Sequence, residues 1–333
     1  MHLKNTVSMK IFKDLPTLVQ ALPELALGDW VDLPADAAAQ LDAPHQSPSA
    51  DLLTQPALRF VARDANEVPR MGYVPWMPVA VLAQMHWPSP SDAVAWSCFL
   101  QAEFGRSQRF VENHDVWDEA DLPEPHWLPA DASLDQRLAH WYQGLQAHAW
   151  MDEEPAQVKP FSRAELRLCE WRLGCALPQS LRDYLLQLGV LDWAERLLSP
   201  RFDLMAPDAD MDAIGSVQVV FPGIADIVEM SASQQALALE AQLSELVVFG
   251  DYLGNGNLWC FDRCDGSVWY LDHDSSPLLT RMFDDVGDYL DALALMSLCR
   301  SHAVAQGRDD GDEQAEVLLE KRFGRALIRK WMY

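Results

Sequence analysis

A pair of strand-like segments at 257–262 and 267–272 constrains the fold of this chain most strongly. The loop between them ends in Asp265-Gly266, which is typical of a tight turn joining antiparallel strands. Two further segments rich in strand-forming residues come before them, at 217–221 and 245–250. The sequence therefore predicts an antiparallel-rich sheet in the second half of the chain.

Helical segments are predicted on both sides of these strands along the chain. A capping box at Ser162 and Glu165 opens one helix, which ends at Gly174. Pro178 suits the first turn of a second helix, which ends at Gly189. Apolar residues at helical spacing predict two more helices after the strands, over 283–299 and 312–333. The predicted fold class is α+β, with the sheet flanked by helices.

The first half of the chain has weaker patterns, and we expect a mainly helical or irregular N-terminal domain there. Residues 28–58 are rich in Asp, Ala and Pro, which predicts an irregular connection. Ser133 and Gln136 form a capping box for a helix that continues to Trp150. The expected organisation is an N-terminal domain of unknown type over 1–150 that is helix-rich in its second half, an acidic linker over 151–160, a second domain over 161–300 and a C-terminal helix over 312–333.

The charge of the chain restricts its partners. Its 333 residues include 25 Lys and Arg against 50 Asp and Glu, a formal net charge of −25. Nucleic acids and anionic membranes are disfavoured, because contacts to phosphate need clustered basic side chains. A protein with a basic surface is favoured, since the opposite charges steer the two together. The same acidity could instead serve only to keep the chain soluble.

We expect a cytoplasmic location with reduced cysteines. Six cysteines in 333 residues are too sparse for a disulfide scaffold. Asp14, Pro16 and Pro23 interrupt the apolar stretch near the N-terminus, so it lacks the continuous apolar region of a secretion signal. No stretch approaches the roughly 18 apolar residues that a membrane-spanning helix needs.

No motif for nucleophilic, metal or phosphate chemistry is complete. The segment from Gly250 to Asn257 lacks the Gly-Lys-Ser/Thr ending of a phosphate loop, so it predicts a tight turn or a loop that contacts a partner. Asp272-His273-Asp274 has groups suited to a metal or to acid–base work. Neighbouring residues on a strand point to opposite sides, which favours a polar strand end instead. We expect no catalytic residue, metal or cofactor; an enzyme with a dispersed site in the first half is the alternative.

Several short motifs follow one another in a characteristic order between residues 162 and 298. They are Glu170-x-x-Leu173-Gly174-x-x-Leu177-Pro178-x-x-Leu181-x-x-Tyr184-Leu185, Phe249-Gly250-Asp251, Gly254-Asn255-Gly256-Asn257-x-Trp259-x-Phe261-Asp262, Gly266-x-Val268, Asp272-His273-Asp274 and Phe283-Asp284-Asp285. In this order and spacing they resemble the SUKH superfamily, the domain shared by a fungal cell-wall regulator and many bacterial immunity proteins.

This resemblance implies binding rather than catalysis. Bacterial members commonly neutralise a cognate toxin delivered by a neighbouring cell, often a nuclease or another enzyme that acts in the cytosol. An acidic antidote for a basic toxin fits the charge of this chain. The resemblance thus implies a cytoplasmic immunity protein that blocks its toxin by occlusion. A regulatory or scaffolding protein that binds an endogenous partner through the same domain is the alternative.

The chain departs from the family pattern after Gly189. Val190-Leu191-Asp192-Trp193 replaces the usual short Asn-Gly loop, and the stretch over 192–215 is enlarged. Three carboxylates in this stretch would lie on one side of an extended chain, which makes them candidate partner contacts. Trp193 is a further candidate because Trp is enriched at binding hot spots. A solvated loop is the alternative for the three carboxylates, which are Asp208, Asp210 and Asp212.

A second acidic group lies at the start of the helix predicted over 283–299. It could contact a partner, or its carboxylates could interact favourably with the positive end of the helix dipole. The group consists of Asp284, Asp285 and Asp288. The other candidate partner contacts are Asp251, Tyr252, Asn255, Asn257, Asp272, His273 and Asp274.

Overall fold

The computed structural model divides the chain into two compact units, each described by itself. The first comprises residues 1–107, 161–175 and 201–211, and the second comprises 108–160, 176–200 and 212–333. The structure describes residues 30–33, 57–63, 69–70, 77–78, 85–86, 98, 102–103, 122–129, 131–152, 160–189, 196–197, 234–251 and 256–332.

In the first unit, β2 (Ala57–Arg63) is the central strand of a small sheet. It pairs in parallel with β1 (Trp30–Leu33) and antiparallel with β3 (Pro69–Arg70) and β4 (Met77–Pro78). β1 lies inside the stretch 28–58, so the prediction of an irregular connection was wrong for these residues. β1 forms by pairing with β2, which is distant in the sequence. The composition around β1 does not indicate that pairing.

The first unit also contains α6 (Arg163–Leu173), which follows Ser162 as the sequence predicts. Gly174 comes after it with φ +68°, a left-handed conformation that glycine adopts without steric cost. Arg167 of α6 forms an ion pair with Glu103, with 3.0 Å from Nε to Oε2 and 3.2 Å from Nη2 to Oε1. The hydrogen bonds to Glu103 raise the pKa of Arg167.

The second unit is built on a five-stranded sheet in which each strand runs antiparallel to the next. Its order is β5 (Arg196–Leu197), β6 (Leu246–Asp251), β7 (Leu258–Asp262), β8 (Val268–Leu271) and β9 (Leu279–Phe283). The predicted hairpin is confirmed, because β7 and β8 pair directly and Gly266 has φ +75° in the turn between them. The segment 217–221 predicted as a strand lies outside the described residues.

The two faces of this sheet bury different side chains, as the alternation along strands requires. On one face, Trp259 of β7 and Phe283 of β9 pack against Tyr289 of α11 (Val286–Ala305), with ring centroids 4.6 and 6.0 Å from that of Tyr289. On the other face, Leu243 of α10 (Gln234–Glu245) packs on an aliphatic cluster. The sheet residues of that cluster are Leu246, Val248, Leu258, Cys260, Leu271 and Leu279.

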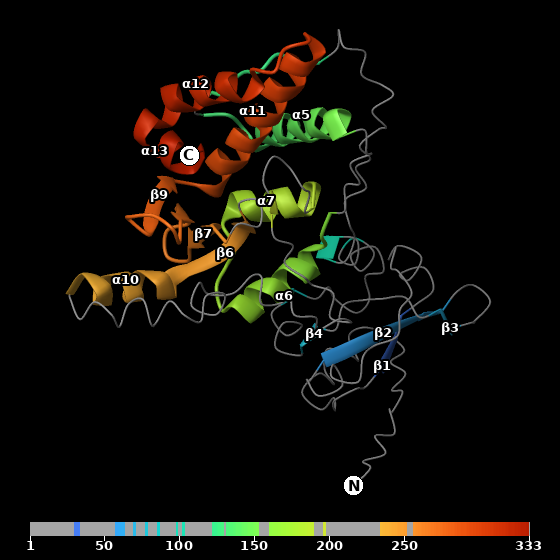
Figure 1. Ribbon diagram of the computed structural model, residues 1–333. Coiled ribbons are helices and arrows are strands. Elements are labelled where there is room, and N and C mark those ends of the chain that lie inside the picture. Colours follow the sequence, from blue (N-terminus) through green and yellow to red (C-terminus); the bar gives the residue numbers. More distant parts are fainter. Residues whose placement is uncertain are drawn as a thin grey trace. The chain divides into compact units, whose positions relative to one another are not determined.

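Helices α5 (Leu134–Asp152) and α7 (Gln179–Gln187) are among those that pack against α11, which is buried along most of its length. Helix α5 begins at the predicted capping box: Ser133 N donates to Gln136 Oε1 and Gln136 N donates to Ser133 Oγ. Helix α7 is preceded by Pro178 and followed by Gly189 at φ +78°. Figure 1 shows α5 running beside α11, on the side away from the strands.

The C-terminal segment forms two helices where the sequence predicted one over 312–333. They are α12 (Gly311–Phe323) and α13 (Arg325–Met332). Gly324 separates them with φ +93°, and this conformation changes the direction of the chain. Because of the change, Phe323 and Trp331 both reach Phe283, at ring centroid distances of 4.8 and 5.7 Å.

Candidate partner-binding site

Polar side chains meet where β7 begins and β8 ends. Asn257 Oδ1 accepts a hydrogen bond from His273 N at 3.2 Å and lies 2.8 Å from His273 Nδ1. Asp272 is held from the other side, because Lys330 Nζ of α13 donates to its Oδ2 at 2.8 Å. His273 Nε2 lies 3.2 Å from Asp274 Oδ2. We call these five residues, Asn257, Asp272, His273, Asp274 and Lys330, the loop-end cluster.

The loop-end cluster divides into a structural part and an exposed part. Asp272 and Lys330 are only 14 % and 17 % exposed, whereas the side chain of Asp274 is 82 % exposed. Burial tends to raise the pKa of Asp272, but hydrogen bonds from Lys330, Ser275 and the Asp274 amide lower it overall. Asp272 thus ties the strand end to α13, while the side chains of His273 and Asp274 are exposed. The three consecutive residues do not converge on one point.

The acidic group at the start of α11 also separates by role. Asp285 caps the helix by accepting from Gly287 N, and Ser180 Oγ donates to the same carboxylate oxygen at 2.6 Å. Asp288 is 20 % exposed and lies 3.7 Å from Arg137 and 3.7 Å from Arg322. Asp284 is 89 % exposed and has Arg281 at 3.0 Å. Asp284 is therefore the most exposed of the three carboxylates.

A buried carboxylate connects α5 to α11. Asp291 is 2 % exposed, accepts from Trp141 Nε1 at 2.6 Å and lies 3.7 Å from Arg137 Nη1. Burial raises the pKa of Asp291 to about 6, against the opposing effects of Arg137 and Trp141. Burial likewise raises the pKa of Asp288. Asp288 and Asp291 therefore contribute to the contact between α11 and α5 rather than to an exposed surface.

The raised pKa of Asp291 predicts a pH-dependent stability. Between about pH 4 and pH 6 the folded chain retains a proton that the unfolded chain has released, so this carboxyl stabilises the fold less as pH rises. Asp291→Asn keeps an oxygen acceptor for Trp141 and removes the titration. We expect the free energy of unfolding of wild type, relative to this variant, to fall by about 1–1.5 kcal/mol from pH 5 to pH 7.5. Urea unfolding of both proteins at pH 5 and pH 7.5 measures this difference. Equal changes in the two proteins would contradict the raised pKa of Asp291.

Two tryptophans of the β7–β8 hairpin, Trp259 and Trp269, are largely taken up by packing. Trp259 is fully buried and has Trp331 at 5.2 Å between ring centroids. Trp269 is partly buried, packs against the aliphatic cluster and donates from Nε1 to Ser267 Oγ at 3.0 Å. The glycine-rich segment contributes to the same packing, because a Cβ on Gly250 would lie 3.1 Å from Trp259 Cβ. Gly256 has φ +92°, which fits a turn.

Of the remaining predicted contacts, Asp251 is the last residue of β6 and pairs with Arg196 of β5. The others lie outside the described residues: Trp193, Asp208, Asp210, Asp212, Tyr252 and Asn255. Among the residues that the structure does describe, no group of three or more His, Cys, Asp or Glu side chains could hold a metal ion.

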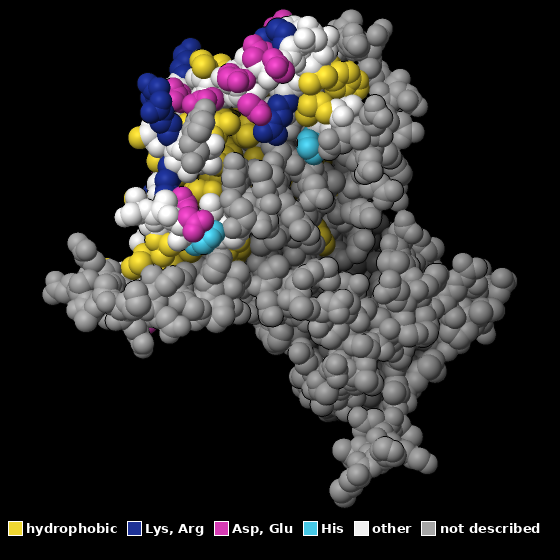
Figure 2. Space-filling view, viewed as in Figure 1, with side chains coloured by type: hydrophobic (Ala, Val, Ile, Leu, Met, Phe, Trp, Pro, Cys, Tyr) yellow, Lys and Arg dark blue, Asp and Glu magenta, His cyan; other side chains and the backbone are white. Residues whose placement is uncertain are grey.

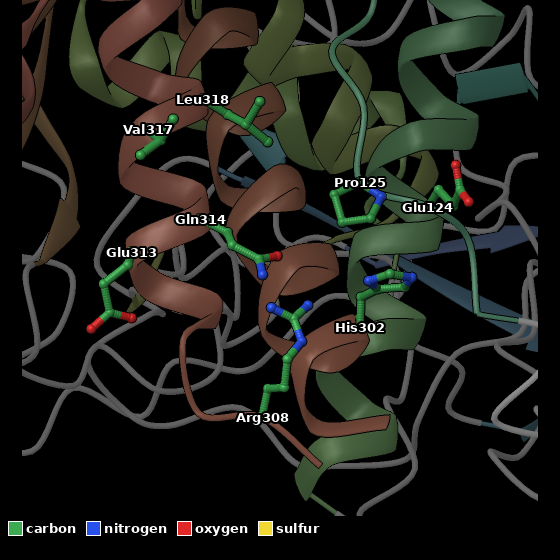
Figure 3. Close-up of a pocket in the computed structure, with 8 residues that line it drawn as sticks. All are labelled: Glu124, Pro125, His302, Arg308, Glu313, Gln314, Val317 and Leu318. Atoms are coloured by element: carbon green, nitrogen blue, oxygen red, sulfur yellow. The ribbon is translucent and has the colours of Figure 1, made fainter. Parts of the chain in front are cut away.

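Sequence reasoning missed a surface pocket of about 520 Å³ formed by segment 122–129, the end of α11 and α12 (Figure 3). Pro125 and Val317 contribute to its walls, and Val317 is 65 % exposed. The sequence shows that position 317 is apolar, but it does not show that this position of α12 is exposed. The pocket could therefore not be predicted from the sequence. The lining residues also include Glu124, His302, Arg308, Glu313, Gln314 and Leu318.

The surface around this pocket has both signs of charge. Figure 2 shows acidic and basic side chains interspersed over α12 and α13. Three arginines in this region have carboxylate partners: Arg300 of α11 pairs with Asp312, Arg308 before α12 pairs with Asp310, and Arg325 of α13 pairs with Glu320. The described residues of this surface are therefore of mixed charge.

The comparisons with known proteins identify one domain. Residues 160–292 match the model of the SMI1 / KNR4 family (SUKH-1), which confirms the predicted SUKH-superfamily domain in this part of the chain. SUKH domains in general bind other proteins. No curated protein and no solved structure matches the chain. None of the helices within the described ranges is both long and apolar enough to cross a bilayer.

Proposed function

We propose that this chain is a cytoplasmic immunity protein that binds and neutralises a cationic toxin delivered by a competing cell. The observation that carries the proposal is the SUKH-1 match over residues 160–292. The charge supports it, because 50 acidic against 25 basic residues give a net charge of −25. A field of this sign accelerates encounter with a cationic enzyme and disfavours acidic competitors.

Neutralisation would proceed by occlusion and would need no reaction by the chain itself. A toxin that acts on nucleic acid presents basic side chains to phosphate, and carboxylates of an inhibitor can occupy the same side chains. Asp274 and Asp284, exposed by 82 % and 89 %, are suited to such contacts within the described residues. We include Trp193, Asp208, Asp210 and Asp212 in the proposed surface on the strength of their sequence pattern.

Capture of the partner tests this function directly. The tagged chain is used to pull down proteins from its native cell at about 0.1 M and about 0.5 M salt, and the bound proteins are identified by mass spectrometry. We expect one basic toxin domain, bound less at high salt because ion pairs are screened. Expressing that domain in a sensitive host should then stop growth unless this chain is co-expressed. An endogenous housekeeping protein as the main partner would instead favour a regulatory or scaffolding role.

Charge reversal separates the proposed surface from overall charge. The triple variant Asp208→Lys, Asp210→Lys, Asp212→Lys should weaken toxin binding by at least tenfold without lowering the unfolding midpoint. A matched triple variant reverses three exposed carboxylates elsewhere and should have a smaller effect. Equal losses in the two variants would show that only total charge matters. The control positions are Asp131, Glu240 and Asp309, all exposed.

A further inference from the structure

The pocket between segment 122–129 and α12 lies outside the matched domain. Every residue that lines it comes from 124–125 or 302–318, whereas the SUKH-1 match covers 160–292. Figure 3 shows Pro125 on one side and Gln314 of α12 on the other, with Arg308 and His302 below. The pocket is therefore built from residues outside the part of the chain that matches the SUKH-1 family.

Trp127 holds the two sides of the pocket in place. Its Nε1 donates to the Leu318 carbonyl oxygen at 3.1 Å, and its ring meets that of Phe323 at 5.5 Å. The Arg322 guanidinium lies 4.9 Å from the centre of the Trp127 ring. These contacts fix segment 122–129 on α12 on the side of Val317 and Leu318. The pocket is thus preformed, which reduces the entropy lost when it is filled.

The lining combines apolar walls with uncompensated negative charge. Pro125, Val317 and Leu318 are apolar, and the side chain of Val317 is 65 % exposed. Arg308 does not supply free positive charge, because its Nη1 lies 2.7 Å from both carboxylate oxygens of Asp310. Two carboxylates, Glu124 and Glu313, occupy the outer edges on opposite sides (Figure 3). Neither forms an ion pair with any residue in the described part of the chain.

We propose that this pocket receives a lysine or arginine side chain of a protein partner. Its aliphatic stem would lie against Pro125 and Val317, and its charged end would meet Glu124 or Glu313. Long basic side chains bury their methylene groups on apolar surface in this way while their charge stays near water. The inference rests on the proposed function, since a cationic toxin supplies such side chains, and it assigns partner recognition to residues outside the SUKH-1 match.

A pair of small probes tests the pocket without the toxin. N-acetyl-arginine amide is titrated into the full chain while the methyl NMR signals of Val317 and Leu318 are followed. N-acetyl-citrulline amide is the matched probe, because it has nearly the same shape and no charge. We expect saturable shifts at these methyls with arginine, and binding of the citrulline probe at least threefold weaker. About 0.5 M salt should remove most of that difference.

Two double variants complete the test. Glu124→Gln with Glu313→Gln should weaken binding of the arginine probe by at least threefold, whereas Asp135→Asn with Glu240→Gln, which neutralises two exposed carboxylates elsewhere, should not. Methyl signals remote from the changes report whether each variant is folded. Equal binding of the two probes, an unchanged affinity in the first variant, or no shift at Val317 overturns the inference. If the toxin is captured but the probe result is negative, the proposed function stands without this pocket. If the probes behave as expected and no toxin is recovered, the pocket stands and the function fails.

Discussion

Trp331→Ala should destabilise the second unit by about 3–5 kcal/mol, the cost typical of removing a large buried aromatic side chain. Trp331 is 1 % exposed, and its ring lies 5.2 Å from Trp259, 5.7 Å from Phe283 and 6.0 Å from Tyr289, measured between centroids. These partners come from β7, β9 and α11. One residue near the C-terminus therefore joins the sheet to the central helix.

Urea unfolding followed by circular dichroism measures this loss, since the variant itself removes a fluorescent side chain. Arg329→Ala is the matched control, because Arg329 lies on the same short helix and is exposed. We expect that control to change the free energy of unfolding by less than about 0.5 kcal/mol. A Trp331→Ala variant as stable as the control would mean that α13 is not part of the folded core. α13 lies outside the matched residues 160–292, but the aromatic partners of Trp331 lie within them. The result therefore shows whether α13 stabilises the SUKH domain.

Gly144→Val should destabilise the contact between α5 and α11 by about 3 kcal/mol, at the upper end of overpacking effects. A Cβ on Gly144 would lie 2.6 Å from Ala294 Cα and 2.7 Å from Ala294 Cβ. The nearest atom belongs to the backbone of α11, so the two helices would have to separate. This contact is close only because both positions have small residues.

Gly144→Ala makes the test sharper because helix propensity predicts the opposite sign. In an exposed helix, replacing Gly by Ala stabilises by about 1 kcal/mol. Here the clash with α11 should outweigh that gain, leaving a net loss of about 1–2 kcal/mol in thermal or urea unfolding. Gln143→Ala, the preceding position on the same helix, controls for propensity alone. A stabilising Gly144→Ala change would show that the helices are less closely packed than described.

Local signals explain why much of the second unit could be predicted. The hairpin between β7 and β8 depends on a turn whose donors and acceptors are a few residues apart: Gly266 N donates to Asp262 O, and Asp262 N donates to Ser267 O, both at 2.8 Å. The start of α5 is equally local, because Ser133 and Gln136 satisfy each other's backbone N–H groups. Such elements can be recognised from a short stretch of sequence.

Non-local partners explain what could not be predicted. The sequence contains no sign that β1 pairs with β2, and nothing near Asp272 indicates that Lys330 will hold it. The candidate group at the start of α11 shows the same limit. Its three carboxylates look alike in sequence, yet Asp288 faces two arginines from other helices while Asp284 is 89 % exposed. Only the packing of α5 and α12 against α11 distinguishes them.

The sequence alone determined the acidic charge, the order of helices and antiparallel strands, and the SUKH domain over residues 160–292, because each depends on composition or on short spacings. The tertiary structure decided that α5, α12 and α13, which lie outside that match, belong to the same unit as α11, with α5 and α12 packed against it. It also decided which polar groups are enclosed and placed a pocket between Pro125 and α12. These outcomes depend on contacts between residues far apart in the chain, and such contacts exist only once the chain has folded.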